Sequence, residues 1–339
     1  MLALIKPDAA PGLRLEHVPM PTPHDGEVLI KVLRTGICGT DMHIYRWDGW
    51  ARSTIAPPLV TGHEFVGTVV ENASDRPLAP GDVVGGESHG ACDVCPSCRA
   101  GASHLCDRTS VIGIHRDGAF AEFVALPAGN VWPWPEPVDL DVAAIFDPFG
   151  NAVHAALHFD LAGEDVAIAG AGPIGLMAAV VARHAGARSV LVSDVSDYRL
   201  ALADRLGVRA ARTLAGGRGA PQPRFSVGLE MSGTGAGLQE LVDQLVPGGR
   251  LAALGLTSDR VELDWSAVVT KMLTIQGIFG RRVFETWEEM SRLVREGLDI
   301  APLVTHRFAC HDFERAFAAV ASRECGKVIL DWDGGTRCA

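Results

Sequence analysis

Hydrophobic and polar positions divide the chain into two regions with different patterns. Up to about residue 137, short alternating or β-branched runs are separated by stretches rich in Gly and Pro, which predicts a β-rich region with long loops. The clearest runs are 28–33, 65–70 and 121–125. Tryptophan and glutamate alternate with proline over 132–137. Because proline disfavours helix, this stretch predicts an extended connection shortly before a domain boundary.

After Leu161, expected strands and helices alternate along the chain. Strands are expected at 165–170, 190–194, 227–231, 250–255 and 273–278, and helices at 174–184, 197–206 and 238–245. This alternation predicts a parallel sheet covered by helices, with enough units for a doubly wound domain. Near the end, an expected helix at 313–320 and an expected strand at 326–332 could return the chain to the first domain.

The two patterns together predict an α/β protein with two domains, and a length of 339 residues favours the same number. We expect residues 1–146 and 295–339 to form the β-rich domain and residues 147–294 to form the doubly wound one. The stretch 215–224 is rich in Gly and Pro and lacks periodicity. We expect a mobile surface loop there and assign it no chemistry.

Charge and apolar content exclude two classes of partner. The formal charge of −11 gives a surface that repels phosphate backbones, and no Lys/Arg-rich run offsets it, so nucleic acid is excluded. The N-terminus lacks the apolar stretch of a signal peptide, and the longest apolar run, 174–182, stops at Arg183. We therefore expect a cytoplasmic protein that does not bind a membrane.

A glycine pattern lies where the first strand of the doubly wound region meets its helix. Gly170, Gly172 and Gly175 match G-x-G-x-x-G, which permits a tight turn and a close approach to a pyrophosphate at a helix N-terminus. The next strand ends at Asp194, whose carboxylate would bind ribose hydroxyls and repel a 2′-phosphate, favouring NAD. Arg199 leaves NADP open, because a nearby Arg can hold that phosphate. A glycine-rich turn with a capping Asp is the non-functional alternative.

Four of the eight cysteines are packed into fifteen residues, which favours a metal site over a disulfide scaffold. Four thiolates close a tetrahedral shell and leave no position for a substrate, so a zinc held here is structural. An iron–sulfur cluster and thiols without a metal are the alternatives. The four cysteines of this lobe are Cys92, Cys95, Cys98 and Cys106, and the remaining thiols, expected to be structural or exposed, include Cys310, Cys325 and Cys338.

A second, looser set of candidate metal ligands is Cys38, His63 and Glu64. Sulfur, nitrogen and oxygen together suit a zinc that keeps a position for water or substrate. Spacing alone does not establish such a site, since a separated Cys and His are often satisfied core residues.

These motifs, in this order, resemble the zinc-containing medium-chain alcohol dehydrogenase family. The matching stretches are GICGTD at 36–41, GHEFVG at 62–67, the four-cysteine lobe and the glycine pattern. Further stretches, at 39–50, 145–154, 228–233 and 284–287, resemble the threonine-oxidising members in particular. The resemblance extends from about Lys31 to Trp332, while Arg46 and 215–224 depart from the family pattern.

The resemblance implies a GroES-like catalytic domain, a Rossmann NAD-binding domain and two zinc ions per subunit. The catalytic zinc would be bound by Cys38, His63 and, at least in some states, Glu64, and would make the substrate alkoxide accessible near neutral pH. Thr40 and His43 match the positions of the family's proton relay; without the resemblance His43 would be an ordinary loop histidine. Asp147 matches an acidic position that orients groups or relays protons beside the zinc, and otherwise would cap a helix before Pro148.

The resemblance also assigns residues to cofactor and substrate. Trp50 and His89 are candidates for the substrate pocket, although each could have a structural role. Core packing is the alternative for the hydrophobic members of the cofactor set. The expected NAD contacts beyond the glycines are Ile174, Asp194, Arg199, Leu254, Gly255, Leu256, Ile278 and Phe279.

The activity that the resemblance implies is oxidation of the L-threonine 3-hydroxyl by NAD, giving 2-amino-3-oxobutanoate and NADH, in a homotetramer. A polyol or secondary-alcohol dehydrogenase with the same zinc and NAD chemistry is one alternative. A noncatalytic NAD-binding sensor is the other, because a fold does not guarantee activity.

Overall fold

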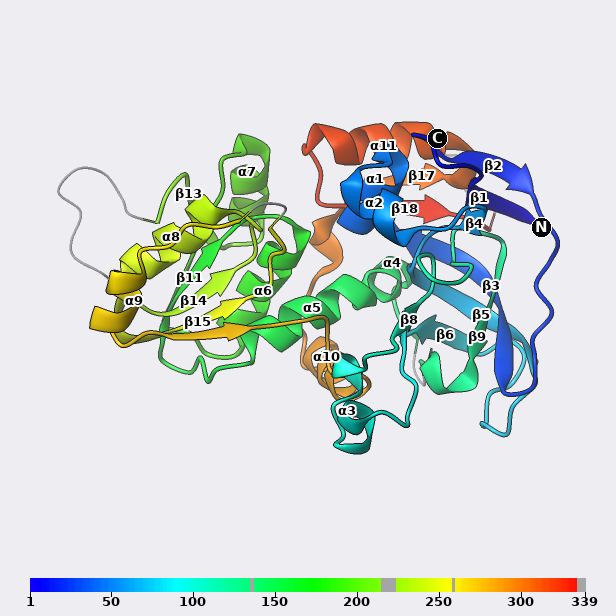
Figure 1. Ribbon diagram of the computed structural model, residues 1–339, viewed down its shortest axis with the longest axis horizontal. Coiled ribbons are helices and arrows are strands. Elements are labelled where there is room, and N and C mark those ends of the chain that lie inside the picture. The colour runs from blue at the N-terminus through cyan, green and yellow to red at the C-terminus, as the bar shows by residue number, and fades with distance from the viewer. Residues whose placement is uncertain (135–136, 215–223, 258–259, 334–339) are drawn as a thin grey trace. The chain divides into compact units, whose positions relative to one another are not determined.

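The structure is a computed structural model that describes residues 1–134, 137–214, 224–257 and 260–333 (Figure 1). The chain divides into two compact units. The first contains Met1–Asp147, Arg282–Trp287 and Val304–Ala339, and the second contains Pro148–Arg281 and Glu288–Leu303. The domain limits expected at 147 and 295 stay a prediction; the structural division differs from them in placing Asp147 and 282–287 in the first unit and 295–303 in the second.

The first unit is built on a seven-stranded sheet with the order β10-β6-β5-β3-β18-β17, in which β9 also pairs with β3. A three-stranded sheet, β2-β1-β4, and a small ladder, β7-β8, accompany it. The strands are β1 Leu2–Lys6, β2 Arg14–His17, β3 Glu27–Gly36, β4 Leu59–Val60, β5 Glu64–Asn72, β6 Val83–Gly86, β7 His89–Gly90, β8 Ser110–Val111, β9 Phe123–Pro127, β10 Val131–Pro133, β17 Val304–Ala309 and β18 Lys327–Asp331. The helices are α1 Gly39–Arg46, α2 Gly49–Thr54, α3 Pro96–Arg99, α4 Leu140–Ala144 and α11 Phe313–Ser322, with the short 3-10 turns η1 Ser103–Leu105, η2 Ala128–Asn130 and η4 Cys310–Asp312.

The register of the large sheet brings distant parts of the sequence to one end of β3. In the antiparallel pair β3–β5, Gly36 lies opposite Glu64, and in the pair β18–β3, Ile329 also lies opposite Gly36. The residues that follow β3, precede β5 and begin β18 are therefore neighbours in space. The same strands bury alternate apolar side chains, such as Val28, Ile30 and Val32, in the core of the unit.

The second unit is a parallel sheet with the order β13-β12-β11-β14-β15-β16. Counted within the unit this order is 3-2-1-4-5-6, so the strand order reverses beside β11, where doubly wound sheets bind their ligands. The strands are β11 Asp165–Ala169, β12 Ser189–Ser193, β13 Arg209–Ala211, β14 Phe225–Glu230, β15 Leu245–Ala253 and β16 Thr274–Gly277. The helices are α6 Pro173–His184, α7 Asp197–Arg205, α8 Gly235–Gln244 and α9 Trp265–Thr270, with η3 Ala301–Leu303, while α5 Phe146–Ala156 and α10 Glu285–Arg295 cross the boundary between the units.

Local sequence explains where the helices of the second unit begin. Pro173 occupies the first turn of α6, where its missing N–H costs no hydrogen bond. Ser196 caps α7 by accepting from the backbone N–H of Arg199, and Thr234 caps α8 in the same way from Gly237. These signals fix the helix starts at the ends of β11, β12 and β14, where a dinucleotide would bind.

The fold expected from the sequence, a β-rich region followed by a doubly wound sheet, is confirmed. The expected strand at 121–125 is displaced, because the ladder with β3 covers Phe123–Pro127. The expected loop at 215–224 lies outside the described residues except for Arg224, and so does Cys338. In the described part of the chain, no helix has the length and apolar composition that crossing a bilayer requires.

Candidate functional site

The looser set of candidate metal ligands is assembled at the end of β3. Cys38 follows β3 and caps α1, while His63 and Glu64 lie where β5 begins, opposite Gly36. One ligand atom from each of the three lies within 4.8 Å of the others. Gly36 leaves room for the Glu64 carboxylate, since a Cβ there would lie 2.2 Å from Glu64 Oε2 and would displace that side chain.

Buried polar atoms around this trio fit a cation. Asp41 Oδ1, His63 Nδ1 and Glu64 Oε1 are buried and have no hydrogen-bond partner in the described part of the protein. Burial lowers the pKa of His63, but the charges of Asp41 and Cys38 outweigh it and raise that pKa to about 10. Burial raises the pKa of Asp41 to about 6 even though His63 opposes it. The negative field that favours a proton on His63 equally favours a divalent metal, and Asp41 Oδ1, 3.8 Å from His63 Nδ1, lies on the side where a carboxylate orients a ligating histidine.

Lys327 is a neighbour of the trio that the sequence reading missed. Its ammonium donates to Glu64 Oε2 at 2.5 Å and to the carbonyl oxygen of Ile37 at 2.9 Å. The Lys327 and Glu64 side chains are only 4% and 0% exposed. Burial lowers the pKa of Lys327, but the charges of Glu64 and Cys38 reverse this and leave it raised. No local motif marks Lys327, because its partner lies 263 residues away.

The expected relay residues lie on α1, beside the trio. Thr40 Oγ1 lies 3.8 Å from Cys38 Sγ, whereas His43 Nδ1 pairs with Asp48 Oδ2 at 2.5 Å on the exposed side of the helix. No hydrogen bond joins Thr40 to His43 among the described residues, so the relay stays a proposal. Trp50 is partly exposed and its ring packs edge-on against His43, with 5.9 Å between centroids.

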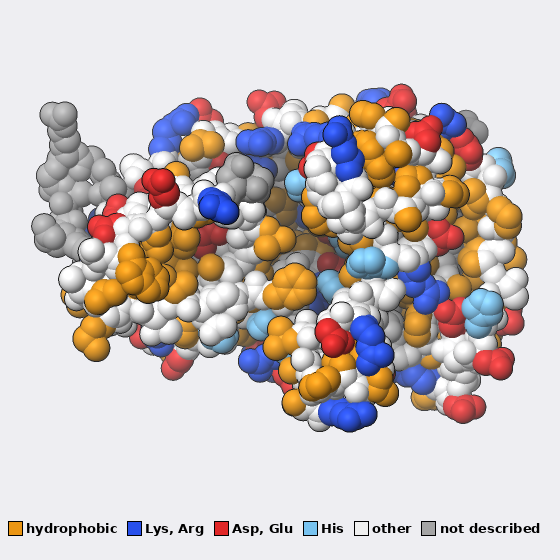
Figure 2. Space-filling model, viewed as in Figure 1, with side chains coloured by type: hydrophobic (Ala, Val, Ile, Leu, Met, Phe, Trp, Pro, Cys, Tyr) orange, Lys and Arg blue, Asp and Glu red, His pale blue; other side chains and the backbone are white. Residues whose placement is uncertain are grey.

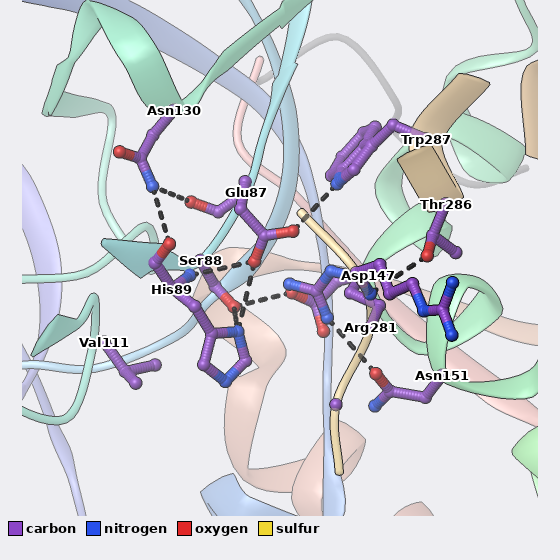
Figure 3. A network of polar contacts seen from close by, with 12 residues as sticks. Glu87, Ser88, His89, Val111, Asn130, Asp147, Asn151, Arg281, Thr286 and Trp287 are labelled. Carbon is purple, nitrogen blue, oxygen red and sulfur yellow. Dashed lines mark hydrogen bonds and ion pairs between the residues drawn. The ribbon is translucent and has the colours of Figure 1, made fainter. Parts of the chain in front are cut away.

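Asp147 and His89 belong to one polar network (Figure 3). Ser88 Oγ donates to Asp147 Oδ2 at 2.7 Å and lies 3.2 Å from His89 Nδ1. Asp147 is buried, and its charge contributes to the raised pKa of His63, which connects this network electrostatically to the metal trio. Ser88 could not be singled out from the sequence, because a serine in a loop carries no motif.

The four-cysteine lobe is folded around its sulfur atoms. One sulfur from each of Cys92, Cys95, Cys98 and Cys106 lies within 4.8 Å of the others. Backbone N–H groups point at these sulfurs: Cys92 and Arg108 donate to Cys106 Sγ at 3.4 and 3.3 Å. Hydrogen bonds, first from the backbone of Val94, lower the pKa of Cys92 to about 6. Such donors favour the thiolate form that binds zinc.

The glycine pattern of the second unit has the geometry expected of a pyrophosphate loop. Gly170 has φ +103°, and an added Cβ would lie 2.8 Å from the backbone nitrogen of Ser232. A Cβ on Gly175 would lie 1.9 Å from the carbonyl oxygen of Gly170, and Gly172 is the N-cap of α6. Neither Gly170 nor Gly175 can be replaced without displacing backbone, and the N-terminus of α6, where Ile174 is the second residue, faces this turn.

Asp194 directly follows β12 and lies beside the same loop. It accepts from the backbone N–H groups of Ala171 and Ser196 at 2.8 and 2.9 Å. Arg199 Nη1 lies 3.6 Å from Asp194 Oδ2. The carboxylate thus lies beside the glycine loop with a guanidinium next to it, and its binding to ribose hydroxyls stays a prediction.

The other expected cofactor residues lie at the ends of β15 and β16. The backbone N–H groups of Leu254 and Gly255 both donate to the carbonyl oxygen of Glu230. Leu256 and Phe279 are exposed in this structure, so core packing does not explain them, whereas Ile278 is buried. Glu230 was missed: burial raises its pKa although Ser232 and neighbouring backbone groups donate to it.

Comparisons with known proteins agree with this geometry. Residues 24–136 match the alcohol dehydrogenase GroES-like domain and residues 173–296 match the zinc-binding dehydrogenase family. The chain is 57% identical to the L-threonine 3-dehydrogenase of Streptomyces avermitilis, covering 98% of this chain and 99% of that one, and 49% identical to that of Deinococcus radiodurans, covering 98% of both.

Two solved structures share the fold at lower identity. Galactitol-1-phosphate dehydrogenase from Escherichia coli has a TM-score of 0.88 at 28% identity, covering 98% of this chain and 100% of that one. An alcohol dehydrogenase from Escherichia coli CFT073, complexed with NADH, has a TM-score of 0.88 at 27% identity, covering 98% and 99%.

Proposed function

This chain belongs to the zinc-binding alcohol dehydrogenase family, and from that premise we propose that it oxidises the 3-hydroxyl of L-threonine with NAD, giving 2-amino-3-oxobutanoate and NADH. The observation that carries the proposal is identity of 57% over nearly the whole chain to an L-threonine 3-dehydrogenase. The assembled Cys38, His63 and Glu64 trio supports the same chemistry from the geometry.

The residues of the trio fit a catalytic zinc, and the four-cysteine lobe fits a structural one, which makes two zinc ions per subunit. Cys38 and His63 would hold the catalytic ion, with Glu64 as a third ligand in some states. Zinc bound there supplies a Lewis acid that lowers the pKa of the substrate hydroxyl. In the lobe all four positions are protein sulfurs, so that ion would stabilise the fold and contact no substrate.

Side chains of the protein would transfer the proton of the substrate hydroxyl and orient the groups at the metal. Thr40 and His43 would carry the hydroxyl proton outward, which requires a connection between them beyond the contacts that they make with Cys38 and Asp48. Asp147, fixed by the hydroxyl of Ser88, would orient groups at the metal. NAD bound at the glycine loop would supply the hydride acceptor, and Asp194 would bind its ribose hydroxyls.

L-threonine carries an ammonium and a carboxylate, and leaving either unpaired in a closed pocket is costly. His89 and Trp50 are the residues we place in the substrate pocket. His89 supplies a polar ring supported by Glu87, whose Oε1 lies 3.1 Å from its Nδ1. With Nδ1–H directed at Glu87, the ring leaves Nε2 as an acceptor, which suits the ammonium of the substrate.

The test is the rate of NADH formation by the zinc-loaded protein with L-threonine, D-threonine, L-serine, sorbitol and 2,3-butanediol. A strong preference for L-threonine with NAD supports the proposal. Preference for sorbitol or butanediol would keep the zinc and NAD chemistry and replace the substrate. If the protein binds zinc and NAD but oxidises none of these compounds, the noncatalytic NAD-binding sensor becomes the favoured function.

We further propose a cytoplasmic homotetramer. One edge strand of the second unit, β16, is exposed along its whole length, and an unpaired edge of this kind favours pairing with another chain. Figure 2 shows hydrophobic side chains gathered around α9 on the same unit. The exposed large hydrophobic residues near β16 are Trp265, Val269, Met272 and Ile275.

A further inference from the structure

The tripeptide Glu87–His89 is held by two side chains of its own unit (Figure 3). Asn130 Nδ2 donates to the carbonyl oxygens of Glu87 and His89 at 2.9 and 3.0 Å. Trp287 Nε1 donates to Glu87 Oε2 at 2.9 Å. Both Glu87 and Trp287 are buried. Asn130 therefore fixes the backbone of the tripeptide, and Trp287 fixes the carboxylate of Glu87.

The fixed tripeptide in turn directs two groups of the proposed active site. Glu87 Oε1 accepts from the backbone N–H of His89 at 2.9 Å and lies 3.1 Å from its Nδ1. The middle residue, Ser88, donates to Asp147. One carboxylate thus receives the indole on one oxygen and the histidine on the other.

Trp287 lies in an aromatic cluster with a second tryptophan, Trp132, which can serve as its control. Its ring centroid is 5.8 Å from that of Trp132 and 5.8 Å from that of Phe146. Trp132 Nε1 is also buried, yet it has no hydrogen-bond partner among the described residues. Two indoles of one cluster therefore differ in whether their N–H bonds to Glu87.

We propose that Trp287 is a positioning residue for the substrate pocket: its indole N–H fixes Glu87, and Glu87 fixes the imidazole of His89. The inference rests on the proposed function, which places His89 at the substrate. Without the indole, the buried Glu87 carboxylate loses one hydrogen bond, and we expect its side chain to rotate toward its other donors. The imidazole moves with the Glu87 carboxylate, and displacing a group that binds the substrate weakens substrate binding.

The first experiment compares Trp287→Phe with Trp132→Phe. Both keep an aromatic ring in the cluster, and only the first removes a hydrogen bond to Glu87. We expect Trp287→Phe to lower kcat/KM for L-threonine about tenfold, mainly through KM, and to leave the KM for NAD unchanged. Trp132→Phe should stay within about twofold of the parent protein. Equal losses in both variants would overturn the proposal in favour of simple packing.

A double-mutant cycle separates positioning from general damage. In a His89→Ala background, Trp287→Phe should cause no further loss, because the group that it positions is absent. The same loss in both backgrounds would refute the path through His89. If Trp287→Phe fails to fold, Glu87→Gln replaces it in the cycle, since an amide has one acceptor oxygen for the donors that the carboxylate serves.

A spectroscopic measurement tests the inference independently of the substrate. The 15N signals of the His89 imidazole, identified by their absence in His89→Ala, should shift in Trp287→Phe and stay in place in Trp132→Phe. Unshifted signals in Trp287→Phe would overturn the proposal. Shifted signals in a protein that does not oxidise L-threonine would uphold the positioning role and refute only the substrate.

Discussion

At the scale of single residues, removing one partner of the buried pair Lys327 and Glu64 should destabilise the protein more than removing one partner of an exposed pair. Removing one partner of a buried pair leaves an uncompensated charge, which costs about 3–5 kcal/mol. We expect Lys327→Met to lower the unfolding free energy of the zinc-free protein by about that amount, and by less when zinc is present to neutralise Glu64. Denaturant unfolding with and without a chelator measures both values.

The matched control is Lys31→Met, which removes an exposed pair with Asp333. Exposed pairs contribute about 0–1 kcal/mol, so this variant should change little in either condition. A similar loss in both variants would mean that burial does not set the energy of the Lys327 pair.

Asp194 and Arg199 together should determine whether the protein prefers NAD or NADP. Asp194→Ala removes the carboxylate that repels a 2′-phosphate and leaves the guanidinium of Arg199, which attracts one. We expect the ratio of kcat/KM for NAD to kcat/KM for NADP to fall at least about tenfold, equivalent to about 1.4 kcal/mol. The ratio is the useful measurement, because Asp194 also holds the backbone of Ala171; an unchanged ratio would contradict the assigned role.

Residues in local motifs could be predicted from the sequence, and residues that act through distant partners could not. Cys38 and His63 lie in recognisable stretches, and the structure brings them together. Lys327, Ser88 and Trp287 carry no local signal for their contacts, because each is defined by a bond across many residues of chain. Side-chain pairs of this kind depend on the register of the paired strands, which cannot be predicted from the sequence alone.

At the scale of elements, the turn that presents His63 depends on Gly62. This glycine has φ +89°, and an added Cβ would lie 2.3 Å from the ring of Phe120. Gly81 has a similar φ of +95° but nothing within 4 Å. We expect Gly62→Ala to lower the unfolding free energy by more than about 3 kcal/mol and Gly81→Ala by about 1 kcal/mol, since the second carries backbone strain alone.

Zinc content provides the functional readout of the same pair of variants. Displacing the turn moves His63, so Gly62→Ala should lose the catalytic metal before it unfolds, while Gly81→Ala should retain it. Full retention of zinc by a folded Gly62→Ala protein would show that the turn adjusts without moving its histidine.

Elements were predictable where their ends carry chemical signals. The start of α6 at Pro173 and of α7 at Asp197 follow from a proline in the first turn and a serine cap. Helices α1 and α2 were not expected, because eight and six residues are too few to display a helical period. Strand β9 was displaced because pairing with β3, rather than local propensity, decides where it begins.

At the scale of the whole molecule, the two metal centres should be independent. Cys38→Ser removes a ligand from one trio and touches none of the four sulfurs of the lobe. We expect this variant to lose activity and about one zinc per subunit while keeping the other. Metal analysis after dialysis measures the count; loss of both ions would contradict separate sites.

The oligomer proposed above predicts a position-specific effect of charge. Val269→Lys places an ammonium among the exposed hydrophobic residues near β16, whereas Val70→Lys places one on the exposed face of β5. Burying an unpaired charge in an interface is costly, so only the first variant should dissociate the tetramer. Light scattering after gel filtration distinguishes the species; dissociation by neither variant would place the interface elsewhere.

The division of the chain into two units could be predicted only in part from the sequence. The change from short β runs to alternating strands and helices is visible in the pattern of apolar residues. The six residues 282–287, which join the first unit although the chain on either side belongs to the second, have no periodicity of their own. Their place is decided by Trp287, whose indole bonds to Glu87.

The late position of β18 in the sequence has a consequence for synthesis of the protein on the ribosome. Glu64 leaves the ribosome 263 residues before Lys327, and at about 5–20 residues per second this separation lasts roughly 13–53 seconds. Throughout that interval β18, which pairs with β3 on the side away from β5, is missing, and the carboxylate of Glu64 lacks the ammonium of Lys327. The nascent chain therefore cannot complete the surroundings of Glu64 until β18 has been synthesised, and chains truncated before β18 should be inactive however well their second unit folds.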